Sequence, residues 1–107
     1  MIKVSFFIAG DYLSGFEISG HSGFAESGSD IVCAAVSSAA YLTANTVTEV
    51  IGALAEADES DGRLSLTLAS PDDKTEIALR GLELHLKELS ALYPKNITLK
   101  YGGVKNA

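Results

Sequence analysis

Residues 63–93 read RLSLTLASPDDKTEIALRGLELHLKELSALY, and this sequence predicts a strand followed by a helix. Apolar and polar residues alternate over Arg63–Leu68, which is typical of a strand with one buried face. Ser70 is a candidate helix cap, Pro71 suits the first helical position, and Pro94 stops the helix. Within the helix, apolar residues recur at steps of three and four and form one stripe: Leu79, Leu82, Leu86, Leu89 and Tyr93.

The flanking segments repeat these two patterns. Alternating apolar residues predict strands over Ile2–Ala9, Leu13–Gly20 and Ile97–Tyr101, and the short turn between the first two makes them an antiparallel hairpin. A first helix is predicted over Ile31–Ala55, because apolar and small residues recur there at helical spacing: Val32, Val36, Ala40, Thr43, Val47, Val50 and Leu54. The acidic residues that follow are interpreted as a solvated linker: Glu56, Asp58, Glu59 and Asp61.

The predicted order of elements is therefore strand, strand, helix, strand, helix, strand (ββαβαβ). Each strand keeps a polar face, which disfavours a parallel sheet covered on both sides. We predict an α+β fold: a two-layer sandwich in which two helices cover one face of a four-stranded, mostly antiparallel sheet. A chain of 107 residues has the usual size of a single domain, so residues 1–107 are expected to form one.

Charge and cysteine content exclude several classes of function. The chain has 8 basic and 14 acidic residues, a net charge of −6, which argues against nucleic-acid binding through phosphate contacts. A single cysteine allows no internal disulfide and is compatible with a cytoplasmic location. Ile31–Ala55 is long enough to cross a bilayer, but its polar side chains disfavour a membrane helix.

The segment from Gly20 to Cys33 holds the candidate chemistry. Gly20, Gly23 and Gly28 mark a long loop, and Asp30 is a candidate cap for the helix that follows. Cys33 falls in the first turn of that helix, where unpaired N–H groups and the helix dipole favour a thiolate over a thiol. A nearby imidazolium would add to this effect, and the same N–H groups can hold an oxyanion. The alternative is that Cys33 is simply a packed core residue.

A metal site is not expected, because one cysteine and two histidines cannot complete one without several carboxylates. Tyr41 and Phe24 are candidates for aromatic contacts with a substrate side chain, although packing in the core or the loop is the simpler role for each.

The segment from Gly20 to Ser37, GHSGFAESGSDIVCAAVS, resembles the ribosomal-processing cysteine protease (Prp) family. The shared pattern is Gly-His, a glycine-containing loop, and then Gly-x-Asp-Ile-Val-Cys-Ala-Ala-x-Ser. The resemblance implies that Cys33 is the nucleophile, that His21 is the general base, and that Asp30 and Ser37 lie beside them. It also implies a homodimer without metal or cofactor. Its implied substrate is the N-terminal extension of a large-subunit ribosomal protein, cut after an aromatic residue.

From this resemblance we expect a cytoplasmic cysteine endopeptidase that acts in ribosome maturation. The loop from Ser22 to Ser29 either closes over the substrate strand or is simply slack, and the sequence does not decide between the two. Two alternatives stay open on the sequence alone. One is a peptide-binding module of ribosome assembly without catalytic activity. The other is a thiol redox sensor, which needs an exposed and reactive Cys33 but no peptide.

Overall fold

The computed structural model describes residues 1–20 and 31–102, which form five strands, two α-helices and one π-helical turn. In chain order the elements are β1 (Ile2–Ala9), β2 (Tyr12–Gly20), α1 (Ile31–Asn45), η1 (Thr46–Ile51), β3 (Ala55–Ser60), β4 (Arg63–Leu68), α2 (Asp73–Leu92) and β5 (Ile97–Gly102). The strands form one sheet in the order β3-β4-β2-β1-β5. The predicted α+β class is confirmed, but the prediction of four strands is wrong.

The sheet is mixed. β1 and β2 form the expected antiparallel hairpin, in which Phe6 lies opposite Phe16. β4 pairs antiparallel with β2 and also with β3. β5 runs parallel to β1, with Ile97 opposite Ile2, because α2 carries the chain across the sheet to its far edge.

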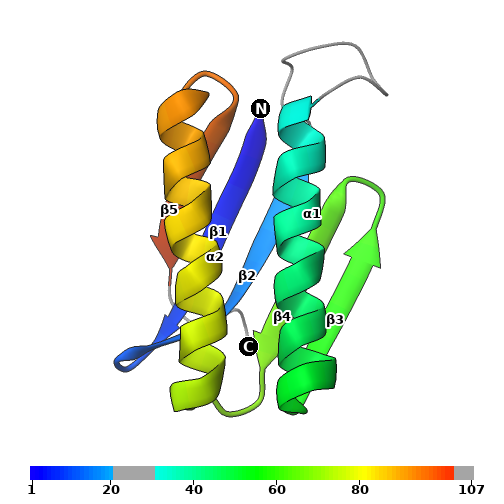
Figure 1. The fold of residues 1–107 in the computed structure, drawn as a ribbon, viewed down its shortest axis with the longest axis vertical. Coiled ribbons are helices and arrows are strands. Elements are labelled where there is room, and N and C mark those ends of the chain that lie inside the picture. The colour runs from blue at the N-terminus through cyan, green and yellow to red at the C-terminus, as the bar shows by residue number, and fades with distance from the viewer. Residues whose placement is uncertain (21–30, 103–107) are drawn as a thin grey trace.

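Both helices cover the same face of the sheet, as Figure 1 shows. α1 and α2 lie side by side, and the core is enclosed between them and the strands. Successive strand residues point to opposite faces, so every second one enters this core. Its most deeply buried members are Ile2, Val4, Phe6, Leu13, Phe16, Val32, Val36, Val47, Leu66, Leu79 and Leu86.

The acidic segment after the first helix is a strand, so its interpretation as a linker is wrong. β3 pairs with β4 along its whole length, and Asp61-Gly62 makes the turn between them. Gly62 adopts a positive φ of 67°, as hairpin turns require. β3 is an exposed edge strand, and edge strands carry charges that discourage pairing with other chains. Its composition therefore reflects its position at the edge.

The first helix ends earlier than predicted. α1 stops at Asn45 and continues as the π-helical turn η1. Gly52 then adopts a positive φ of 75° while its amide donates to the carbonyl of Val47, which ends the helical segment. Thr48 donates to the carbonyl of Ala44, a type of contact that distorts helices.

The second helix starts two residues later than predicted, because Asp72 and not Ser70 is its cap. The Asp72 carboxylate accepts from the Thr75 amide at 2.9 Å, and the Thr75 hydroxyl accepts from the Asp72 amide at 2.9 Å. This reciprocal pair satisfies two amides that the helix start would leave unpaired. Pro71 therefore precedes the helix.

Within residues 1–20 and 31–102, one helical segment, Ile31–Ile51, is long and apolar enough to cross a membrane. Core helices of globular proteins pass the same test, and this segment packs Val32, Val36 and Val47 into the core.

Candidate active site

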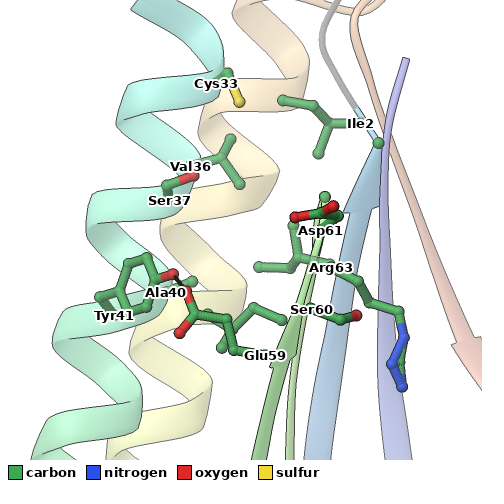
Figure 2. A pocket seen from close by; sticks show the side chains of 14 residues that line it. Ile2, Cys33, Val36, Ser37, Ala40, Tyr41, Glu59, Ser60, Asp61 and Arg63 are labelled. Atoms are coloured by element: carbon green, nitrogen blue, oxygen red, sulfur yellow. Dashed lines mark hydrogen bonds between the residues drawn. The ribbon is translucent and has the colours of Figure 1, made fainter.

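A pocket of about 330 Å³ lies between α1 and the strands on the β3 side of the molecule. α1 lines it with Cys33, Val36, Ser37, Ala40 and Tyr41. The opposite side is formed by Ile2, Ile18, Gly20, Leu64 and the β3–β4 hairpin from Glu59 to Arg63. Figure 2 shows these side chains facing one another across the gap between helix and sheet.

One face of α1 carries the polar groups of the pocket. Cys33, Ser37 and Tyr41 follow one another at steps of four residues, which places them on the same side of a helix. Cys33 is partly buried, and its sulfur points towards Ile2 and the pocket (Figure 2). Cys33 packs against the core and also lines the pocket. Because Cys33 is the third residue of α1, it is in the turn whose N–H groups lack partners within the helix.

The backbone at Gly20 forms the upper rim of the pocket. Gly20 has a φ of 90°, and a Cβ built on it would lie 2.4 Å from the carbonyl oxygen of Met1. Its amide donates to the carbonyl of Gly62 at 2.9 Å. Only glycine fits here without strain, and the contact holds the end of β2 against the β3–β4 turn. His21 is bonded directly to Gly20, so this rim fixes where the chain leaves β2.

The lower end of the pocket is acidic. The Tyr41 hydroxyl donates a hydrogen bond to the Glu59 carboxylate, which connects α1 to β3. This hydrogen bond raises the pKa of Tyr41 above its usual value, with smaller contributions from burial and from the Glu59 charge. Asp61 adds a second carboxylate to the lining of the pocket.

Arg63 lines the same pocket, but its guanidinium pairs with other carboxylates. Its Nε lies 3.6 Å from Glu17, and its Nη2 lies 3.5 Å from Asp58. Figure 2 shows this side chain directed away from Glu59. The acidic end of the pocket is therefore not neutralised by its nearest arginine.

The structure brings together three of the site residues predicted from the sequence: Gly20, Cys33 and Ser37. Tyr41, a candidate substrate contact, lines the same pocket. The other predicted positions lie outside the described residues: His21, Gly23, Phe24, Gly28 and Asp30.

Glu59 and Asp61 were missed as pocket residues, because the acidic segment was interpreted as a linker. The Asp61-Gly62 dipeptide before an alternating strand was the available signal, since it is typical of a hairpin turn. Among the residues that the structure describes, no group of three or more His, Cys, Asp or Glu side chains is placed to hold a metal ion.

Comparisons with known proteins identify the family and support the fold. The family model of the cysteine protease Prp matches residues 1–98. No curated protein matches the chain. Among solved structures, the ribosomal processing protease Prp from S. aureus, with a covalently linked product peptide, superposes with a TM-score of 0.89 at 23% identity. That match covers 95% of this chain and 100% of the other.

Two further structures extend the comparison. The same S. aureus protease with a substrate peptide gives a TM-score of 0.84 at 22% identity, with coverage of 95% and 100%. SMU.848 from Streptococcus mutans gives 0.79 at 28% identity, with coverage of 96% of this chain and 95% of the other. The structures support the fold, and the family model spans nearly all of the sequence. The chain therefore belongs to the cysteine protease family of Prp.

Proposed function

We propose that this cysteine protease removes the N-terminal extension of a large-subunit ribosomal protein, with Cys33 as the nucleophile and His21 as the general base. The observation that carries the proposal is the position of the only cysteine in the chain. Its thiol opens into a pocket at the start of α1, beside the backbone that leads directly to His21. A cysteine protease needs its thiol where a peptide carbonyl can reach it, and this position meets that need.

In the proposed reaction, His21 accepts the proton of the Cys33 thiol, and the thiolate attacks the carbonyl carbon of the scissile bond. The amides of the first turn of α1 donate to the oxyanion of the tetrahedral intermediate. The protonated His21 then gives its proton to the leaving amine, and the C–N bond breaks. Water, deprotonated by His21, releases the acyl group and restores the thiol.

The proposed substrate class rests on the family and on charge. The S. aureus relatives of this fold are ribosomal processing proteases, solved with a product peptide and with a substrate peptide. Ribosomal proteins are basic, and a chain with a net charge of −6 attracts them at long range. We expect cleavage after an aromatic residue, as family resemblance implies, with Asp30 and Ser37 supporting the two catalytic groups.

We further propose that the protein acts in the cytoplasm as a homodimer without a cofactor. The family resemblance is the basis for the dimer, and the site of ribosome assembly is the basis for the location. Sedimentation equilibrium tests the oligomeric state, and a mass of one chain at micromolar concentration would contradict it.

The direct test is a cleavage assay with a synthetic peptide that carries the extended N-terminus of the ribosomal protein, followed by mass spectrometry. We expect cleavage at one site, at a rate that falls at least a thousandfold in Cys33→Ala and in His21→Ala. The matched controls are Ser38→Ala, an exposed residue of the same helix, and His85→Ala, the only other histidine and an exposed one. Both controls should cleave normally.

Other outcomes separate the alternatives. Tight binding of an uncut peptide would support a binding module in place of a protease. Reversible oxidation of Cys33 by peroxide, with neither binding nor cleavage, would support a redox sensor. Normal cleavage by Cys33→Ala would overturn the assigned nucleophile.

A further inference from the structure

We infer that Glu59 is a specificity-determining residue, which makes this pocket prefer peptides with a lysine or arginine close to the cleaved bond. The inference rests on the proposed function, because it treats the Cys33 pocket as the substrate site. It adds a selective residue on β3, an element that carries none of the catalytic groups.

The pocket changes in character along its length. The Cys33 thiol lies at one end, and Tyr41 and Glu59 lie at the other. Cys33 and Tyr41 are eight residues apart on α1, which corresponds to about 12 Å along the helix axis. Apolar side chains line the space between them: Ile2, Ile18, Val36, Ala40 and Leu64.

An apolar wall that leads to a carboxylate suits a long side chain with an apolar stem and a cationic head. Lysine and arginine bury their methylene groups against apolar surface while the charge stays at a polar end. A side chain that enters part-way along this apolar wall has the Glu59 carboxylate ahead of it. An aromatic side chain at the cleaved bond would fill the part nearest Cys33, so the basic residue belongs to a neighbouring position of the peptide.

The charge of Glu59 is available for such a partner. Within residues 1–20 and 31–102, the one contact found for its carboxylate is the hydrogen bond from the neutral Tyr41 hydroxyl. The nearest arginine, Arg63, is engaged by Glu17 and Asp58. The Asp61 carboxylate on the same rim strengthens the negative potential.

The hydroxyl of Tyr41 has a positioning role in this arrangement. Its bond to Glu59 holds the carboxylate against α1, facing the pocket, while a carboxylate can accept more than one donor. A substrate ammonium or guanidinium therefore adds to the contact and need not displace Tyr41.

The test compares matched peptides that differ only by lysine or glutamine, at each of the three positions before and after the cleaved bond. We expect one position at which the wild-type protein prefers lysine about fivefold in kcat/KM, the size of a partly exposed ion pair. In Glu59→Gln this preference should fall to about one, because the lysine side chain then faces a neutral amide.

Glu56→Gln is the matched control, because Glu56 lies on the same strand, faces the other side of the sheet and carries the same charge. It should keep the lysine preference. Tyr41→Phe should reduce the lysine preference without abolishing it, because the Glu59 carboxylate remains but the hydroxyl no longer holds it against α1.

Three results would overturn the inference: no preference for lysine at any position, a preference that persists in Glu59→Gln, or a preference lost equally in Glu56→Gln. Failure of the proposed function is distinct, since wild-type protein would then cut neither member of any pair, and the inference would fall with it.

Discussion

At each edge of the sheet a tyrosine donates a hydrogen bond to a glutamate across the two layers, yet the surroundings of the two glutamates differ. At the β5 edge, Tyr101 donates to Glu83 of α2 at 2.5 Å. At the β3 edge, Tyr41 of α1 donates to Glu59. The first glutamate is buried among cations, and the second lines an open pocket.

The β5 contact is part of a complete ionic network. Glu83 is 9% exposed, and it accepts from Arg80 at 3.1 Å and lies 3.7 Å from the ammonium of Lys87. Lys87 also lies 5.8 Å from the centre of the Tyr101 ring. Burial alone would raise the pKa of Glu83, but these donors and charges outweigh it and hold the pKa below its ordinary value.

The β3 contact joins the same two residue types, a tyrosine and a glutamate. Within the described part of the chain, however, its glutamate, Glu59, has no ion-pair partner. A buried carboxylate destabilises the fold unless cations of the protein compensate its charge, whereas a carboxylate that lines a pocket can pair with a cation of a bound ligand. The comparison therefore separates a glutamate that stabilises the fold from one that is available for binding.

The largest expected effect on stability comes from disturbing the rim of the pocket. Gly20→Ala should lower the free energy of unfolding by about 2–3 kcal/mol, because a Cβ meets the Met1 carbonyl and the φ of 90° disfavours alanine. Gly10→Ala is the control, since its φ is 63° but no atom lies within 4 Å of the added carbon. It should lose only about 1 kcal/mol. Equal losses in urea titrations would show that the close approach at Gly20 is not important.

The next largest effect is a difference in stability between variants of the two glutamates, Glu83 and Glu59. Glu83→Gln removes the charge that Arg80 and Lys87 face, and it should cost about 1–2 kcal/mol at pH 7. Glu59→Gln should change the free energy of unfolding by less than about 0.5 kcal/mol. Chemical denaturation of both variants measures the difference, and a similar cost for the two would refute the distinction drawn between the edges.

The pH dependence of stability tests the same difference between the two glutamates. The pKa of Glu83 lies below its ordinary value of 4.5, so the folded state favours the charged form. Its stabilisation is fully present above pH 4.5 and is lost as the pH falls through the lowered pKa. The stability difference between wild-type protein and Glu83→Gln should therefore shrink as the pH falls below 4.5. A difference that is constant over this range would argue against the network.

The smallest effect is expected for the tyrosine of the pocket. Tyr41→Phe should leave stability within about 0.5 kcal/mol, because its hydroxyl is exposed. Tyr101→Phe should cost about 1 kcal/mol, because Glu83 is left with one donor fewer in a buried setting. Thermal unfolding measures the loss of stability in both variants. A larger loss for Tyr41→Phe than for Tyr101→Phe would contradict the prediction.

The fold was predictable from the sequence where hydrophobic periodicity was strong. The alternation in Arg63–Leu68 and the leucine stripe of α2 correspond to the strand and helix observed. Periodicity could not find β3, since an edge strand with exposed side chains has no apolar pattern. The parallel pairing of β5 with β1 was equally hidden, because strand order depends on how the helices pack across the sheet.

Some residues of the site were also predictable from the sequence, and others were not. Cys33, Ser37 and Gly20 were identified from a local motif, and they line one pocket. Glu59 was not identified, because it reaches the pocket only through the pairing of β3 with β4. Helix capping shows the same limit on a smaller scale: Asp72 and Ser70 are both good caps, and only the contact with Thr75 distinguishes them.

The central claim is that the pocket beside Cys33 is the active site. Its most direct measurement uses a short peptide chloromethyl ketone that ends in phenylalanine, with the adduct located by mass spectrometry. The account predicts one adduct on Cys33, formed at least tenfold faster than with a ketone that ends in glycine, and slowed by the extended ribosomal peptide. An unlabelled Cys33, or equal rates with both ketones, would contradict it.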